Sequence, residues 1–388
     1  MTAPLVYLVA GEPSGDLLGA RLMAGLKEMT GGAVAFAGVG GEAMRAQGMT
    51  SLFPQADLAV MGVAEVIPRI PLILKRLSQT VADVEAKRPA VLVTIDSWGF
   101  TGRLAMRLKE RGSRIPRVHY VAPMVWAWKE KRALKLARCI DLLMCLLPNE
   151  PPFFERVGLP AVHVGHPVLE GGADKGDGAA FRQRHGLDGD APILCVLPGS
   201  RHSETSRLLG VFGDTAATLA ERYPGLSVVV PTVETVAEEV RACVASWPMP
   251  VRVVHGLQER YDAFAASRAA LAASGTVALE LALAGVPMAI GYRVAPLTAF
   301  LARLLLKVRY VCLLNLLMDR SVVPEFLQED CRTELLVPAL AGLLDDGPVR
   351  QAQLDGNHEA LIRLGLGGES PSRRAAAQVL RMMRKENT

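Results

Sequence analysis

The segment Gly11-Glu12-Pro13-Ser14-Gly15-Asp16 places small, hydroxyl and acidic residues directly after an apolar run and before a helical pattern. Glycine lets the backbone approach a ligand closely, and the first turn of a helix offers free N–H groups and a positive dipole to an anion. We therefore take Glu12, Ser14, Gly15 and Asp16 as candidates for a phosphate-binding loop. An ordinary turn in which Ser14 or Asp16 caps the helix explains the pattern about equally well.

A single carboxylate, Asp96, follows the apolar run Val91 to Ile95. In this position it could act as a general base that takes the proton from a hydroxyl group. A hydroxyl is a poor nucleophile until its proton is removed, so one such base opposite a leaving group suffices for an inverting sugar transfer. An aspartate that merely caps the following turn is about as compatible with the sequence.

A second anion-binding pattern is Pro198-Gly199-Ser200-Arg201, which follows the apolar run Ile193 to Leu197 and precedes a helical pattern. The guanidinium of an arginine pairs well with phosphate oxygens. Because the apolar run, the glycine turn and the arginine coincide, we favour a diphosphate site at Ser200 and Arg201 over a helix cap with Arg201 in solvent.

A third pattern, Ala273 to Glu280, again follows an apolar run. Ser274, Gly275 and Thr276 can present N–H and hydroxyl donors to phosphate, and Glu280, about one helical turn further on, can accept from ribose hydroxyls. An unpaired carboxylate in so apolar a stretch would be costly, which argues for a ligand or partner at Glu280. These residues outline a nucleotide-sugar pocket.

The elements that must position these residues alternate between short apolar runs and helical patterns, which predicts an α/β fold with parallel sheets. In such sheets ligands bind beyond the carboxyl ends of the strands, where the candidate residues lie. The predicted strands are Leu5 to Ala10, Ala90 to Ile95, Arg117 to Val121, Leu142 to Leu147, Pro192 to Leu197, Leu226 to Val230, Val251 to Val254, Ala269 to Ala272 and Pro287 to Gly291.

The length of 388 residues predicts two domains, since a single hydrophobic core rarely grows so large. The Gly/Asp-rich stretch Glu170 to Gly178 reads as a linker, after which the α/β rhythm restarts. We expect an N-terminal domain over residues 1–168, a linker over 169–180, a C-terminal domain over 181–350 and a helical tail over 351–388. Two doubly wound, Rossmann-like lobes imply a cleft between them.

Composition excludes several classes of protein. With 50% apolar and 21% charged residues the chain is globular, and with only 5% aromatic residues it is poorly equipped to stack nucleic-acid bases. The N-terminus lacks the basic region of a secretory signal, and no apolar stretch reaches the roughly 20 residues needed to span a bilayer. Scattered cysteines without CxxC spacing argue against a metal, and Gly38 to Gly41 lack the full GxGxxG spacing of a dinucleotide cofactor site.

Taken together, these motifs resemble those of the bacterial lipid-A-disaccharide synthases, which have the two-lobed glycosyltransferase fold called GT-B. The resemblance runs in order along nearly the whole chain. It rests on Ala10 to Asp16, Met61 to Val66, Ile95-Asp96, His119 to Val121, Val125 to Trp128 with Lys131-Arg132, Leu197 to Arg201, Ala273 to Glu280, Gly291 to Arg293 and Asn315 to Leu317.

The resemblance implies transfer of a 2,3-diacylglucosamine unit from its UDP derivative to 2,3-diacylglucosamine 1-phosphate, which gives the β-1,6-linked lipid A disaccharide 1-phosphate and UDP. It implies that the N-terminal domain binds the acceptor and lipid, that the C-terminal domain binds the UDP-sugar, and that no cofactor is needed. Asp96 corresponds to the family's candidate base, Arg201 to its phosphate-side arginine and Glu280 to the ribose-binding glutamate.

This chain departs from the family pattern after the candidate base. The family often continues with Ala-Pro-Asp-Phe-Asn, whereas Ser97-Trp98-Gly99-Phe100-Thr101 follows here, and Ala122-Pro123-Met124 replaces a more polar Ser-Pro-Ser. No second carboxylate is therefore available at position 99, which weakens any mechanism that needs a pair of carboxylates there.

Two apolar and basic segments suit a surface that dips into an anionic leaflet, although core helices with solvated ends explain them about as well. With lipid substrates we favour peripheral association with the inner, cytoplasmic face of the cytoplasmic membrane, and the resemblance suggests a homodimer. The expected membrane patch consists of Ile70, Leu72, Ile73, Leu74, Leu304 and Leu305.

Two alternatives stay open at this stage. Another UDP-sugar enzyme of the same fold, such as an N-acetylglucosaminyltransferase or an epimerase, would share the nucleotide pocket. A two-lobed protein that senses a nucleotide sugar without turning it over would share it too, but would not need Asp96.

Overall fold

The structure, a computed structural model, describes residues 3–58, 63–123, 131–187, 189, 191–295, 299 and 309–384, with the backbone alone at 63–67 and 131. The chain divides into two compact units. Unit 1 comprises Met1–Pro167 and Gly367–Thr388, and unit 2 comprises Val168–Leu366. Each unit is described by itself below.

Unit 1 is built on a sheet of six parallel strands in the order β2-β1-β3-β4-β5-β6. Central strands with nearly every residue buried, such as β1 and β3, are typical of parallel sheets covered on both faces. The strands are β1 (Leu5–Ala10), β2 (Ala35–Val39), β3 (Val91–Ile95), β4 (Arg117–Tyr120), β5 (Leu142–Cys145) and β6 (Ala161–His163).

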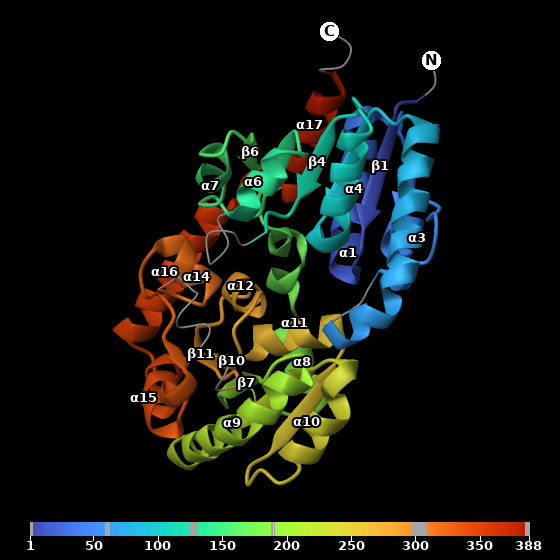
Figure 1. The fold of residues 1–388 in the computed structure, drawn as a ribbon. Helices are drawn as coiled ribbons and strands as arrows, with labels where there is room; N and C mark the ends of the chain where they lie inside the picture. The colour runs from blue at the N-terminus through green and yellow to red at the C-terminus, as the bar shows by residue number, and fades with distance from the viewer. Residues whose placement is uncertain are drawn as a thin grey trace. The chain divides into compact units, whose positions relative to one another are not determined.

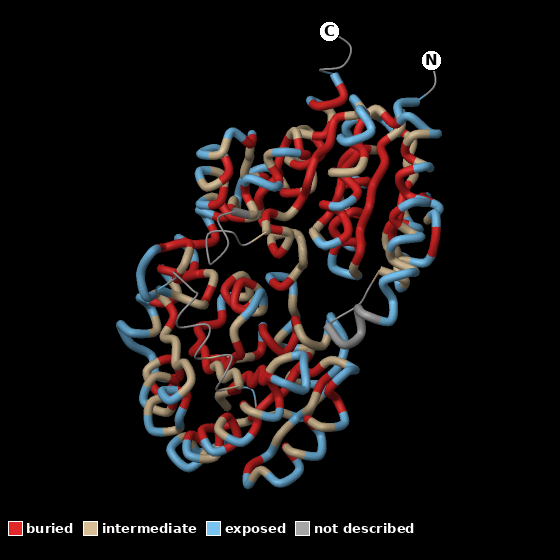
Figure 2. Tube along the Cα trace, in the orientation of Figure 1, coloured by how far each residue is buried: buried red, intermediate tan, exposed pale blue. Residues whose placement is uncertain are grey.

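Helices cover both faces of this sheet, so that the strands form a buried layer (Figures 1 and 2). On one face α1 and α17 pack against β1 and β3 through a core that includes Leu22, Val379 and Leu8. On the other face α3 and α4 pack against Tyr7 and Leu92. The helices of unit 1 are α1 (Pro13–Thr30), α2 (Glu42–Ala46), α3 (Val63–Lys87), α4 (Trp98–Glu110), α6 (Lys131–Ala137), α7 (Pro151–Glu155) and α17 (Pro371–Arg384).

Unit 2 repeats this plan with six parallel strands in the order β12-β11-β10-β7-β8-β9. The strands are β7 (Ile193–Leu197), β8 (Ser227–Thr232), β9 (Val251–His255), β10 (Ala269–Ala272), β11 (Met288–Tyr292) and β12 (Glu325–Leu327). The helices are α8 (Gly178–His185), α9 (His202–Arg222), α10 (Ala237–Val244), α11 (Leu257–Ala266), α12 (Val277–Leu283), α14 (Leu313–Met318), α15 (Thr333–Leu344) and α16 (Pro348–Leu364).

The α/β fold is thus confirmed, and all nine strands expected from the sequence are present with small shifts at their ends. Three strands were not foreseen: β2, β6 and β12. Two of them have only three residues, and β2 contains Gly38, which a strand pattern disfavours. Gly38 is needed there, since its φ is +137° and a Cβ would lie 1.8 Å from the carbonyl oxygen of Leu8.

The stretch read as a linker forms ordered structure. It contains the short 3₁₀ helices η2 (Pro167–Glu170) and η3 (Ala173–Lys175), and η3 packs against α11. Residues 351–388, taken from the sequence as one tail, are shared between the units. The helix α16 packs on α12 and α15 in unit 2, whereas α17 packs on α1 in unit 1.

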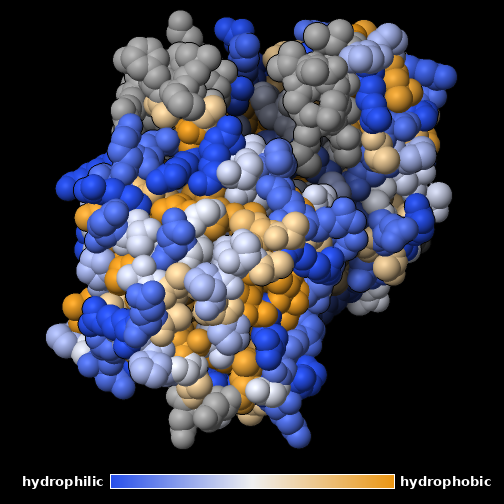
Figure 3. All heavy atoms as spheres, turned by 90° about the horizontal axis from the view of Figure 1, so that it is seen from below, coloured by the Kyte–Doolittle hydropathy of each residue, from blue (hydrophilic) through white to orange (hydrophobic). Residues whose placement is uncertain are grey.

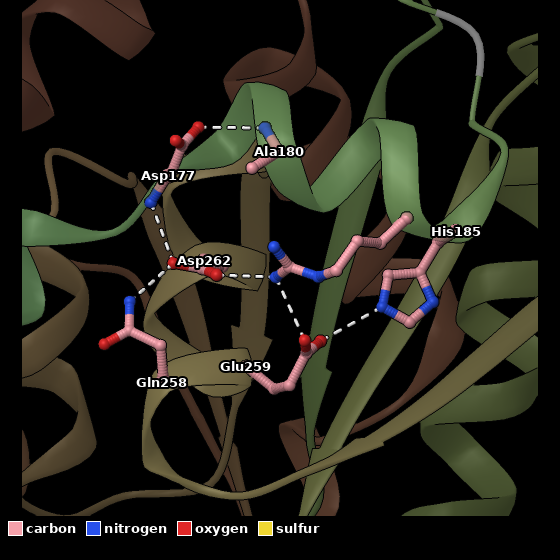
Figure 4. Close-up of polar contacts among 7 residues, drawn as sticks. Asp177, Ala180, His185, Gln258, Glu259 and Asp262 are labelled. Atoms are coloured by element: carbon pink, nitrogen blue, oxygen red, sulfur yellow. Dashed lines mark hydrogen bonds and ion pairs between the residues drawn. The ribbon is translucent and has the colours of Figure 1, made fainter.

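A network of charged side chains ties α8 to α11 in unit 2 (Figure 4). The buried carboxylate of Asp262 accepts from the backbone N–H of Asp177 and from Nε2 of Gln258, each at 2.8 Å, and pairs with Arg184. Glu259, one turn earlier on α11, also pairs with Arg184 and contacts His185. These contacts outweigh the effect of burial and hold the pKa of Asp262 below its ordinary value.

We expect Asp262→Asn to lower the free energy of unfolding at neutral pH by about 1–3 kcal/mol, because it removes the ionised acceptor of three hydrogen bonds. A group whose folded-state pKa is depressed stabilises the protein above its unfolded pKa and loses that effect as the pH falls. The difference from wild type should therefore be constant above about pH 5 and shrink below about pH 4.

Urea denaturation at several pH values, followed by circular dichroism, measures this difference. Asp174→Asn is the control, since Asp174 is exposed on η3. A difference that grows on acidification would contradict the expected role of Asp262.

Candidate functional site

In unit 1 the Gly11 loop and Asp96 lie at the same edge of the sheet. They follow β1 and β3, which pair in parallel with Ala10 opposite Ile95. The two turns approach so closely that a Cβ on Gly11 would lie 2.7 Å from Oγ of Ser97. Oγ of Ser97 donates to Oε1 of Glu12 at 3.3 Å. The structure thus brings Glu12 next to the turn that carries Asp96.

The backbone at this edge is strained. Asp96 and Ser97 both adopt left-handed conformations, with φ of 50° and 44°, and Val121 at the end of the neighbouring strand β4 has φ of 79°. Such conformations cost on the order of 1–3 kcal/mol each and tend to cluster at functional sites. The carboxylate of Asp96 is half-buried and accepts no hydrogen bond from the residues that the structure describes. It is therefore available to a ligand.

Asp16, although part of the same loop, is occupied within the protein. Its buried carboxylate accepts the backbone N–H groups of Gly41, Ala43 and Met44 at 2.7 to 3.1 Å, which fixes the start of α2. Gln55 holds the other side of the loop by donating to the carbonyl oxygens of residues 10 and 12. Ser14 is exposed, and Gly15 is packed against β1 and β3.

In unit 2 the two remaining motifs line one cavity of about 380 Å³. They follow β7 and β10, which are adjacent parallel strands. Six residues expected from the sequence meet there: Ser200, Arg201, Ser274, Gly275, Thr276 and Glu280. The side chain of Arg201 is 66% exposed, so its guanidinium is accessible to an anion.

Glu204 shapes the turn beneath Arg201. Its carboxylate accepts the backbone N–H of Ser200 at 3.0 Å and lies 3.5 Å from the guanidinium of Arg201. Gly199 has φ of +112°, and a Cβ there would collide with Glu204. The carboxylate of Glu204 therefore preorganises the turn. Glu204 was not among the site residues predicted from the sequence. A signal for it was present, since Glu204 lies three residues after Arg201, the N-cap of α9, which is the usual position of a capping glutamate.

Glu280 does not lie unpaired in its apolar surroundings. Nη2 of Arg260 donates to its Oε1 at 3.0 Å, and the hydroxyl of Tyr261 reaches the same oxygen at 3.4 Å. Burial raises the pKa of Glu280, and the charge of Arg260 acts in the opposite direction. Arg260 also lines the cavity. No sequence signal pointed to it, because it lies within the helix α11 and does not follow a strand.

Four of the six residues of the expected membrane patch lie within the part of the chain that the structure describes. Ile70 and Leu74 on α3 are 44% and 42% exposed, whereas Ile73 packs against the core and Leu72 is half-buried. Arg76 pairs with Asp57 at 2.6 Å. Leu304 and Leu305 lie outside the described residues, as do the motif residues Met61-Gly62 and Val125 to Trp128. Within the described residues no helix has the length and hydropathy needed to cross a membrane.

Two six-stranded parallel sheets, each followed at its carboxyl edge by turns that are candidates for anion binding, are the arrangement of the GT-B class of folds. A solved structure supports the fold: UDP-GlcNAc 2-epimerase from Neisseria meningitidis bound to UDP-GlcNAc matches 98% of this chain and 99% of its own, with a TM-score of 0.62. At 12% identity this likeness shows the fold alone.

Comparison by sequence identifies the family. The model of the lipid-A-disaccharide synthetase family matches residues 6–379. Proteins named lipid-A-disaccharide synthase from Paramagnetospirillum magneticum and Rhodospirillum centenum are 61% and 55% identical to this chain, over 98% of it and over 98% and 95% of their own lengths. The chain belongs to the lipid-A-disaccharide synthase family and is a glycosyltransferase.

We expect Asp16→Ala to destabilise the protein by about 2–3 kcal/mol, because three backbone N–H groups lose a charged acceptor. Ser14→Ala, two positions away on the exposed side of the loop, should stay within about 0.5 kcal/mol of wild type. Chemical denaturation of the two variants measures the difference. Equal stability would show that the carboxylate does not hold the loop and α2 together.

Proposed function

We propose that this protein condenses UDP-2,3-diacylglucosamine with 2,3-diacylglucosamine 1-phosphate to give the lipid A disaccharide 1-phosphate and UDP, with inversion at the transferred sugar. The observation that carries the proposal is the cavity of unit 2, where the turns after β7 and β10 and the carboxylate of Glu280 converge. Family membership supports the acylated substrates, because the relatives are named for this product.

The donor chemistry falls to unit 2. Arg201 and the donors at Ser274 to Thr276 would bind the diphosphate, and they would stabilise the charge that develops on UDP as the bond from its phosphate to the sugar breaks. Glu280 would accept from the ribose. Of its two oxygens only Oε1 has a partner among the described residues, so Oε2 is left to accept from a ligand.

The acceptor chemistry falls to unit 1. Asp96 would take the proton from the 6-hydroxyl of the acceptor as its oxygen attacks the anomeric carbon of the donor. Two features support this role: the carboxylate is free among the described residues, and the left-handed backbone at Asp96 and Ser97 sets its direction. Glu12 and Ser14 would face the acceptor phosphate region, while Gly15 lets the loop lie close against β1 and β3 and Asp16 holds the loop from behind.

Asp96→Ala should lower the rate of acceptor-dependent UDP release by about a hundredfold or more, because general-base catalysis contributes roughly 10²–10⁴-fold to a rate. The assay follows UDP from UDP-2,3-diacylglucosamine with and without 2,3-diacylglucosamine 1-phosphate in mild detergent. Glu110→Ala, an exposed carboxylate at the end of α4, is the matched control and should retain activity. UDP affinity should be unchanged in both variants.

Two outcomes would oppose this function. Wild-type protein that binds UDP but releases none with this acceptor would favour a sensor or another acceptor. Full activity of Asp96→Ala would show that a different group takes the proton.

We also propose that the exposed end of α3 contacts the cytoplasmic face of the membrane from which the acylated substrates are drawn. Ile70 and Leu74 present apolar side chains beside the exposed basic residues Arg69 and Lys75, a combination suited to an anionic leaflet. Leu72 and Ile73 would support the patch from beneath, whereas Leu304 and Leu305, the other expected members, lie outside the described residues. A homodimer, suggested by the family resemblance, stays a prediction.

The double variant Ile70→Ser/Leu74→Ser should reduce binding to anionic phospholipid vesicles by about tenfold or more, because each buried aliphatic side chain contributes roughly 1.5–3 kcal/mol. Co-sedimentation measures the bound fraction. Hydrophobic side chains are also exposed elsewhere (Figure 3), so Val349→Ser/Ile362→Ser on α16, at 60% and 53% exposure, is the matched control. Equal loss in both double variants would contradict a specific patch on α3.

A further inference from the structure

We propose that Arg260 is a positioning residue of the donor site, which orients the carboxylate of Glu280 so that its second oxygen accepts from the ribose hydroxyls of the nucleotide. This inference rests on the proposed function, since it assumes that the cavity of unit 2 holds UDP. It adds a residue that no motif indicated.

The contacts of Glu280 support this role. Nη2 of Arg260 and the hydroxyl of Tyr261 both approach Oε1, at 3.0 and 3.4 Å, and leave Oε2 without a partner among the described residues. The side chains of Arg260 and Glu280 are 27% and 18% exposed, so their pairing is only partly screened by solvent. A carboxylate fixed through one oxygen presents the other in a defined direction.

Arg260 is itself held at a cost. Its Nε–H is buried and has no acceptor in the described part of the chain. A buried donor without a partner is unfavourable by about 1–3 kcal/mol, and native proteins retain few of them. The observed position of the guanidinium therefore leaves one of its hydrogen-bond donors without an acceptor among the described residues. Its position is explained by the pairing with Glu280.

The helix α11 fixes this geometry from its other side. Glu259 and Asp262, one turn apart, anchor the helix to α8 through Arg184 and the Asp177 N–H (Figure 4). Successive residues of a helix are turned by about 100°, so Arg260 and Tyr261 leave the helix in other directions. The α8 network thus holds the helix that delivers them to Glu280.

The two arginines of the cavity consequently have different tasks. Arg201 is largely exposed and lies 3.5 Å from its acidic neighbour Glu204, which leaves its guanidinium to a phosphate. Arg260 has closer contact with its carboxylate and less exposure. Its effect on nucleotide binding should therefore pass through Glu280 and depend on the ribose hydroxyls, not on the diphosphate.

A comparison of UDP with 2′,3′-dideoxy-UDP tests this assignment by isothermal titration calorimetry on the full chain. Arg260→Met should weaken UDP binding by about tenfold, the effect expected for losing a hydrogen bond to a charged group. It should leave binding of the dideoxy nucleotide within about twofold of wild type. In a Glu280→Gln background, adding Arg260→Met should change UDP affinity by less than about twofold, because residues that act as one unit are not additive.

Arg252→Met, an exposed arginine on β9, is the matched control and should bind both nucleotides as wild type does. Thermal melting of every variant verifies that it is folded. Equal weakening of both nucleotides by Arg260→Met, or additive losses with Glu280→Gln, would show that Arg260 acts on the diphosphate or on the fold, and would overturn the inference. Failure of wild type to bind UDP would instead overturn the proposed function itself.

Discussion

Parallel pairing of adjacent strands is the constraint on which the rest of this structure depends. In unit 2, Leu197 at the end of β7 lies opposite Ala272 at the end of β10, so the turns that follow must be neighbours. In unit 1 the same holds for Ala10 and Ile95. Because the strands within each sheet are parallel, the free N–H groups of the helices that follow them lie at one edge of that sheet. The helices and their cores serve to hold that edge in place.

Buried carboxylates have two different roles in this structure. Asp16, Glu204 and Asp262 each accept backbone N–H groups and so fix a turn or a helix start. An ionised carboxylate can be buried only where donors surround it, so these three stabilise the loops they touch. Glu280 differs, since it is held by side chains through one oxygen and lines the cavity. Among the described residues, the three structural acids have contacts on both carboxylate oxygens, whereas Glu280 has them on Oε1 alone, which is why we propose that its second oxygen accepts from a ligand.

Much of this architecture was predictable because buried parallel strands are continuous apolar runs. The candidate phosphate-binding turns could be selected because they combine glycine with hydroxyl or arginine side chains. The strands β6 and β12 escaped notice because three residues are too few to show a pattern. Arg260 escaped because a charged residue in an amphipathic helix normally faces solvent. The sequence did not distinguish the role of Asp16 from that of Ser14. Their contacts do, because Asp16 accepts backbone N–H groups and Ser14 is exposed.

The sequence by itself determined the α/β class, the positions of the two cavity turns and the family, since these depend on local pattern and on motif order. Tertiary structure alone decided that Arg260 pairs with Glu280, that a side chain at position 11 would collide with Ser97, and that α17 packs on α1. These contacts join residues from 20 to more than 300 positions apart. No local propensity encodes such pairings, because they arise only when the sheets bring distant segments to one edge or one face.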